Sequence, residues 1–276
     1  MSNGESAKVV IEPRRQPGEP ALAGPGLLLL NPADLRQAVG LLQEVGGWRR
    51  HRLFHSDLWQ DSNSKAWLAG PAVGAPMAVL LLEKLLALGA DAVIAVGWAG
   101  ALQPDLKTGT LLLPTAALSE EGTSAHYLHP APAPGGYPAP SGRLPALRGL
   151  PRGLTLPAVS TPAPALLANL AAFLKQRGLS PRQGPVWTTD APYRETRAKV
   201  RAYRRAGIRA VDMEYGALAT AARFRQRELA AALLISDQLD EDQPWQPAFS
   251  HKEFRRRVRE LLRLLLAYIT TGDSYV

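Results

Sequence analysis

Two acidic clusters stand in the stretch RAVDMEYGALATAARFRQRELAAALLISDQLDED, which covers residues 209 to 242. Asp212 and Glu214 flank Met213 at the end of a short apolar run, and Asp237 follows after one predicted helix and one predicted strand. Carboxyl groups orient hydroxyl groups, exchange protons and neutralise developing positive charge. Because two successive strand ends carry these carboxyl groups, we predict that they belong to one site.

A small-residue motif marks a third strand end. The stretch VGWAGAL, residues 96 to 102, is expected to leave its strand through a turn where a ligand can approach the backbone amides. A tight connection between a strand and a helix explains the same glycines, so both interpretations stay open. The candidate binding residues of this turn are Gly97, Trp98, Ala99 and Gly100.

A fourth strand end lies in WTTDAPYRE, residues 187 to 195. It places Thr189, Asp190 and Tyr193 around a proline turn, where hydroxyl and carboxyl groups can bind a ligand. Helix capping by Thr189 or Asp190 is the alternative interpretation.

The elements that must position these residues alternate between strands and helices. Apolar periodicity, proline at helix starts and glycine at helix ends indicate an α/β domain with a largely buried central sheet and helices outside it. In such sheets ligands bind beyond the carboxyl ends of the strands. The predicted strands include 26–30, 65–70, 91–97 and 108–118, and the predicted helices include 32–45, 71–89, 165–178, 214–226 and an amphipathic C-terminal helix around 254–265.

Length and composition bound the remaining possibilities. The 276 residues, 46% of them hydrophobic, suit one domain over residues 1–276, with an N-terminal extension over 1–24 and a Pro/Gly-rich loop over 129–164. The absence of cysteine excludes disulfides, thiolate metal sites and a cysteine nucleophile. The net charge of +8 comes from arginines scattered over separate elements, so we expect no nucleic-acid partner.

Two targeting features are absent from the sequence as read. The N-terminal stretch lacks the apolar core of a signal peptide, and no segment approaches the roughly 18 uninterrupted apolar residues of a membrane helix. We therefore expect no membrane partner and a cytoplasmic protein.

The order of these motifs resembles that of the nucleoside phosphorylase superfamily, most closely its uridine phosphorylase and hexameric purine nucleoside phosphorylase branch. The resemblance covers about residues 26–240 and runs through 70–128, TTDAPYRE, VDMEYGALATAARF and LLISDQLD. It implies a three-layer α/β/α sandwich with a mixed, partly barrel-like central sheet. It also implies a pentosyltransferase of nucleoside salvage that cleaves the N-glycosidic bond with phosphate, without a metal or organic cofactor.

The resemblance assigns roles to the acidic residues. Glu214 would accept hydrogen bonds from ribose hydroxyls while Met213 packs against the sugar. Asp237, oriented by Ser236, would meet N7 of the base, which favours a purine. From the residues alone, Glu214 can instead be a first-turn acid of its helix, and Asp237 can be a loop cap.

The chain departs from the phosphorylase pattern at the phosphate. Where the family has an arginine at the end of the strand and a hydroxyl in the turn, this chain has Ala95 and Trp98. Arg52 matches the arginine that a neighbouring subunit contributes, and Arg36 in LNPADLR is a candidate substitute for the missing loop arginine. Trp98 can stack on the base, fill the empty phosphate site or belong to the core.

Three hypotheses of function remain open from the sequence. The first is a nucleoside phosphorylase with altered phosphate contacts, and the second is a hydrolytic nucleosidase that uses water. The third is a nucleoside-binding or assembly protein without catalysis. A homodimer, or a hexamer built from dimers, would complete each site. No metal site is expected, because no carboxylate joins His126 and His129 at ligand spacing.

Overall fold

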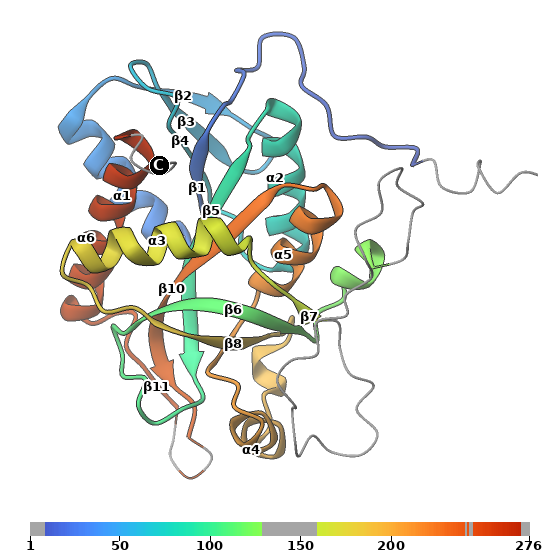
Figure 1. Cartoon of the computed structure of the whole chain (residues 1–276), viewed down its shortest axis with the longest axis vertical. Helices are drawn as coiled ribbons and strands as arrows, with labels where there is room; N and C mark the ends of the chain where they lie inside the picture. The colour runs from blue at the N-terminus through green and yellow to red at the C-terminus, as the bar shows by residue number, and fades with distance from the viewer. Residues whose placement is uncertain (1–8, 129–158, 241, 243–244, 272–276) are drawn as a thin grey trace, which may run out of the picture.

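The computed structural model describes residues 9–128, 159–240, 242 and 245–271 (Figure 1). The predicted Pro/Gly-rich loop lies outside the described residues except for 159–164, where β7 (Val159–Ser160) and the first residue of α3 lie. His129 also lies outside the described residues.

Five strands close a barrel at the centre of the molecule. β5 pairs with β10 in parallel, β10 with β6 antiparallel, β6 with β8 and β8 with β9 in parallel, and β9 returns to β5 antiparallel. The sheet continues from β5 through β1, β4, β3 and β2, and β11 (Gln246–Pro247) pairs with the end of β10. The mixed, partly barrel-like sheet expected from the sequence is therefore confirmed. The barrel strands are β5 (Ala92–Ala101), β6 (Leu111–Ser119), β8 (Arg182–Thr188), β9 (Ala210–Asp212) and β10 (Glu228–Gln238), and the extension holds β1 (Pro25–Leu29), β4 (Trp67–Gly70), β3 (Asp57–Asp61) and β2 (Trp48–Arg52).

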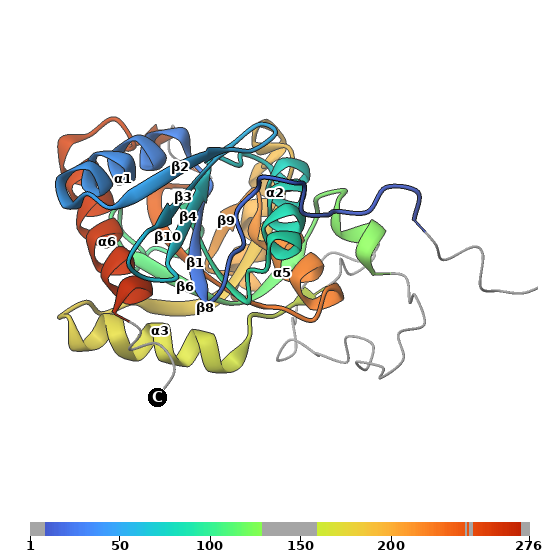
Figure 2. The ribbon, with the colours of Figure 1, turned by 90° about the horizontal axis from the view of Figure 1, so that it is seen from above.

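Helices cover the sheet on both sides (Figure 2). α1 (Pro32–Val45), α3 (Pro164–Gln176) and α6 (Lys252–Thr270) share one apolar cluster, while α2 (Ala75–Leu88) and α5 (Tyr215–Phe224) share another. β5 serves both clusters, because its alternating side chains point to opposite faces: Val93 and Ala95 pack towards α2 and α5, and Ile94 towards α1 and α6. A third cluster packs α4 (Arg197–Arg205) against Trp187.

One predicted turn is wrong. Residues 97–100 do not leave the strand, because β5 continues through them to Ala101 and stays paired with β10 and β9. The glycines serve close packing instead: a Cβ on Gly97 would lie 2.6 Å from Leu30 Cδ1, and one on Gly100 would lie 3.1 Å from Asp237 Oδ2. Gly100 thus allows the Asp237 carboxylate to lie against β5.

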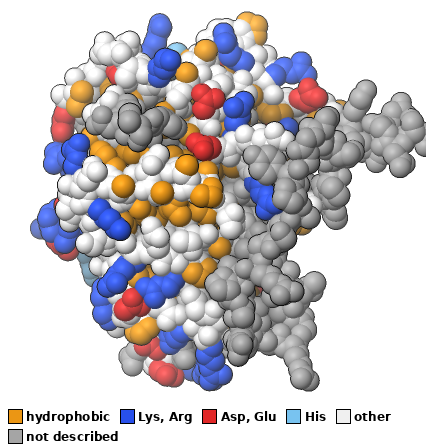
Figure 3. Space-filling model, viewed as in Figure 1, with side chains coloured by type: hydrophobic (Ala, Val, Ile, Leu, Met, Phe, Trp, Pro, Cys, Tyr) orange, Lys and Arg blue, Asp and Glu red, His pale blue; other side chains and the backbone are white. Residues whose placement is uncertain are grey.

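The surface carries an apolar area over α3 (Figure 3). Ala165, Ala168 and Ala172 are exposed there on the side of the helix that faces away from the sheet. Within the described ranges, no helix is long and apolar enough to cross a membrane.

Candidate functional site

A cavity of about 470 Å³ opens where β5, β9 and β10 end; we call it the strand-end cavity. The two acidic clusters meet here as predicted, because the three strands lie side by side in the barrel. Most of the predicted site residues line the cavity, namely Trp98, Ala99, Gly100, Tyr193, Met213, Glu214, Ser236 and Asp237.

Four predicted residues lie elsewhere. Gly97 is enclosed in β5 against Leu30, and Arg52 is exposed on β2, away from the lining. Thr189 and Asp190 hold the chain after β8: the Thr189 hydroxyl accepts from Ala191 N at 3.3 Å, and Asp190 Oδ2 accepts from Gly122 N at 2.9 Å.

Asp212 holds the first acidic cluster together by hydrogen bonds within the protein. Its carboxylate accepts hydrogen bonds from Thr188 Oγ1 at 2.6 Å, Tyr215 N at 2.6 Å and Glu214 N at 3.1 Å. These bonds fix the chain between β9 and α5. Burial raises the pKa of Asp212 to about 6, although the three donors lower it.

Glu214 is the buried acid that this anchor presents to the cavity. It is 7% exposed, and its Oε1 accepts from Gly74 N at 2.6 Å, a hydrogen bond from the loop before α2. Glu214 stands at the N-cap position of α5, but its side chain makes no cap bond and accepts from Gly74 N instead. Burial, and then the negative charge of Asp212, raise the pKa of Glu214 to about 8.

Asp237 lies one residue before the end of β10, just after a bulge in the pairing of β10 with β5. Its Oδ1 accepts from the Ser236 hydroxyl at 2.6 Å, the contact expected from the Ser-Asp motif, and its Oδ2 accepts from Trp245 Nε1 at 2.8 Å. The carboxylate is therefore oriented by two donors and does not act as a loop cap.

Trp98 closes the region where the family pattern has its phosphate contacts. Its indole donates to Asp34 Oδ1 at 3.1 Å, its ring stacks on Phe249 at 5.9 Å and it meets Phe254 edge-on at 5.3 Å. Asp34 is 1% exposed, and burial raises its pKa to about 7 even though the Trp98 bond lowers it. Trp98 thus packs between α1 and α6 and also borders the cavity.

The strand-end cavity has an acidic lining. Among the described residues that line it there is no Lys or Arg, whereas Glu195, Asp212, Glu214 and Asp237 all contribute carboxyl groups. Ala95 is fully buried in the apolar cluster of α2 and α5 and does not open on the cavity. Arg36 is exposed on α1 and is not part of the lining either.

Sequence reasoning missed Glu195 and Trp245 as site residues. Glu195 follows the short 3₁₀ turn Pro192–Arg194, and Trp245 precedes β11. Glu195 was visible as another acid just beyond a strand end, which is the signal that could have found it. Trp245 carries no such signal, because only the pairing of β11 with β10 brings it to Asp237.

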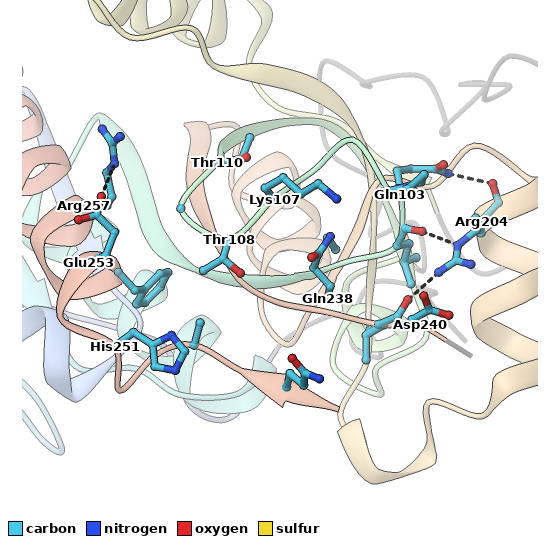
Figure 4. Close-up of a pocket in the computed structure, with 18 residues that line it drawn as sticks. Gln103, Lys107, Thr108, Thr110, Arg204, Gln238, Asp240, His251, Glu253 and Arg257 are labelled. Carbon is cyan, nitrogen blue, oxygen red and sulfur yellow. Dashed lines mark hydrogen bonds and ion pairs between the residues drawn. The ribbon is translucent and has the colours of Figure 1, made fainter. Parts of the chain in front are cut away.

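A larger cavity of about 760 Å³ lies beyond the ends of β5 and β10; we call it the loop cavity (Figure 4). Some of its polar groups are bound within the protein. Figure 4 shows Arg257 paired with Glu253 at one end, and Arg204 donating to Leu102 O and Leu239 O at the other. None of the predicted site residues lines it, so size alone does not identify the site.

Comparisons with known proteins agree with the fold. A family model described as the phosphorylase superfamily matches residues 29–270. Uridine phosphorylase of Thermococcus kodakarensis is 34% identical over 102 residues, and the match spans only 37% of this chain and 37% of that curated relative.

Solved structures share the fold at low identity. Purine nucleoside phosphorylase of Toxoplasma gondii has a TM-score of 0.69 at 16% identity, covering 91% of this chain and 92% of that one. The 5'-methylthioadenosine/S-adenosylhomocysteine nucleosidase of Helicobacter pylori has a TM-score of 0.65 at 18% identity, covering 90% and 98%.

Proposed function

Because the chain belongs to the phosphorylase superfamily, we propose that it cleaves the N-glycosidic bond of a nucleoside in the strand-end cavity. The observation that carries this proposal is the meeting of Met213, Glu214 and Asp237 around one cavity. Uridine phosphorylase, purine nucleoside phosphorylase and a nucleosidase among the similar proteins all act on nucleosides by their names.

The proposed chemistry divides the cavity into a sugar end and a base end. Cleavage builds positive charge on the sugar and negative charge on the departing base. Glu214, fixed by Gly74, accepts hydrogen bonds from ribose hydroxyls while Met213 packs on the ring. Asp237 meets the N7 edge of the base, which favours a purine.

Phosphate is the acceptor that the family resemblance implies, and it is the first candidate. Hydrolysis by water is the second candidate, favoured by the acidic lining. A phosphate dianion needs donors and cations, and the described lining offers no basic side chain. Arg52 of a neighbouring subunit would supply a basic side chain. Whether the protein uses phosphate therefore depends on how its subunits assemble.

We also propose a homodimer or a hexamer of dimers, a role in nucleoside salvage and a cytoplasmic location. The apolar side chains of Phe54, Val73 and Leu80 are 86%, 52% and 52% exposed, and Val73 borders the cavity. Such a surface supports a contact with a second copy beside the site.

Glu214→Ala tests the proposed function directly. The variant should lose base release from any nucleoside that the wild-type protein cleaves, because no other carboxylate replaces its contact with the ribose hydroxyls. Its circular dichroism and thermal transition should stay close to wild type, since little core volume is removed. Glu214→Gln, which can still accept from Gly74, is the matched control for the fold. Wild-type turnover in Glu214→Ala would refute the role.

A further inference from the structure

The segment that follows β10 returns to the strand-end cavity and is fastened beside Asp237. Pro247 of β11 lies opposite Asp237 in the pairing of the two strands. Ala248 N donates to Ser236 O at 2.9 Å. These backbone contacts hold the segment against the end of β10. Trp245, the residue before β11, thereby becomes part of the cavity lining.

Burial does not explain why Trp245 lies there. The residue is 55% exposed, and its ring meets Phe249 at a centroid distance of 6.2 Å. A half-exposed tryptophan gains less from burial than one in the core. Its indole N–H donates to Asp237 Oδ2 at 2.8 Å, in an exposed hydrogen bond. Because the backbone already holds the segment, we expect this bond to contribute little to stability.

Two donors, one on each oxygen, fix the plane of the Asp237 carboxyl group. The Ser236 hydroxyl donates to Oδ1 at 2.6 Å, and the indole of Trp245 donates to Oδ2. Rotation of an aspartate about its Cβ–Cγ bond has only broad preferences, so one donor alone would let the group turn. Oδ2 also lies against β5, because a Cβ at Gly100 would be 3.1 Å from it. Trp245 and Gly100 thus hold Oδ2 between them.

We propose that Trp245 is a positioning residue, whose indole N–H holds the Asp237 carboxyl group in the plane in which it meets the base. The inference rests on the proposed function, in which Asp237 contacts the base. Groups that contact a substrate must stay within about 0.5 Å of their productive geometry, and hydrogen bonds from neighbouring side chains keep them there. Without the indole N–H, the carboxyl group turns about its bond to Ser236, and both base binding and cleavage weaken.

Two substitutions separate the N–H of Trp245 from its ring. Trp245→Phe keeps an aromatic ring and removes the donor. Trp245→His keeps an N–H at the place in a five-membered ring that the indole Nε1 occupies. Trp48→Phe is the matched control, because Trp48 lies on β2 outside the strand-end cavity. Base release from adenosine, inosine, guanosine and uridine gives kcat and KM for the nucleoside that wild type cleaves fastest.

Trp245→Phe should lower kcat/KM by about 10- to 10²-fold, the loss expected when a group of the site is displaced by about 1 Å. Its thermal transition should stay close to that of wild type, since the exposed bond contributes little to the fold. Trp245→His should recover most of the lost kcat/KM, and Trp48→Phe should lose none.

Binding of the released base shows whether Trp245 acts through Asp237. Calorimetry measures the Kd of this base for wild type, Trp245→Phe, Asp237→Ala and the double variant. Trp245→Phe should weaken binding about 10-fold in the otherwise wild-type protein, as for one lost hydrogen bond. It should change nothing in the Asp237→Ala background, because the group that it positions is then absent.

Three results would overturn the positioning role of Trp245. The first is wild-type kcat/KM in Trp245→Phe. The second is equal loss in Trp245→Phe and Trp245→His, and the third is equal weakening of base binding with and without the Asp237 carboxyl group; both would assign the effect to the ring. If wild type releases base from none of the four nucleosides, the proposed function itself fails, so the two failures are distinguishable.

Discussion

At the scale of single residues, the carboxyl groups of the strand-end cavity differ in what holds them. Asp212 accepts from Thr188 at the end of β8 and from the backbone of Glu214 and Tyr215, and Asp237 accepts from two donors. Glu214 accepts a hydrogen bond from Gly74 N, and within the described part of the chain the side chain of Glu195 makes no hydrogen bond or ion pair. The surroundings of these carboxyl groups therefore differ although the residue types are alike.

Buried Asp34 should make the stability of the protein depend on pH. Its pKa is raised from 3.8 to about 7 by burial, so between these values the folded state binds a proton that the unfolded state has lost. Stability from this group is therefore lost as pH rises from about 4 to about 7, by about 4 kcal/mol at most. Asp34→Asn removes the titration, while its amide oxygen can still accept from Trp98.

Urea unfolding at about pH 5 and about pH 8 measures this difference. Wild type should lose more unfolding free energy between the two conditions than Asp34→Asn does. The other raised acids, such as Glu214, are common to both proteins and cancel in the comparison. If the unfolding free energy changes equally between the two pH values in both proteins, Asp34 is not protonated when it is buried.

At the scale of elements, proline and glycine in the sequence predicted where helices begin and end. Helix α1 begins at Pro32 and ends at Val45 as predicted, and Gly89 caps α2 in the left-handed region with φ of 109°. The end of β5 was misjudged because long-range pairing with β10 holds residues 97–100 in the strand. The hairpin of β2 and β3 was missed, since WRRHR lacks a clear apolar alternation and depends on sheet pairing.

In the candidate site, too, the local sequence predicted some features, and long-range contacts decide others. The sequence placed Glu214 and Asp237 at two strand ends, but it did not show why these ends meet. They meet because the short antiparallel strand β9 and the end of β10 both pair with β5 at Gly100. The Trp98–Asp34 bond joins residues 64 positions apart, and the Trp245–Asp237 bond depends on β11. No local sequence pattern predicts either contact.

Arg204 should stabilise the strand ends that hold Asp237 in place. From α4, its Nε donates to Leu102 O and its second guanidinium nitrogen to Leu239 O, both at 2.6 Å, so it joins the ends of β5 and β10. Arg204→Ala should lower the unfolding free energy by about 1–3 kcal/mol and raise KM for the nucleoside. The exposed neighbour Arg205→Ala is the control. Denaturant unfolding and steady-state kinetics check both, and equal behaviour of the two variants would contradict the role.

At the scale of the whole molecule, all strands of the described chain belong to one sheet, which supports the prediction of a single domain. Exposed Phe54 is two residues from Arg52 and exposed Val73 lines the cavity, so we expect two copies to pair there. Light scattering at micromolar concentration should give the mass of a dimer or hexamer. Phe54→Asp should shift the protein towards the monomer, and a monomeric wild type would contradict the proposed assembly.

The most direct test is a nucleoside panel with and without phosphate, in which free base and sugar products are measured. We predict base release from a purine nucleoside, together with phosphate binding no tighter than the millimolar range, which corresponds to about 4 kcal/mol. Ribose as the product identifies water as the acceptor, and ribose 1-phosphate identifies phosphate. If no nucleoside releases its base under either condition, the strand-end cavity does not cleave nucleosides and the central claim is wrong.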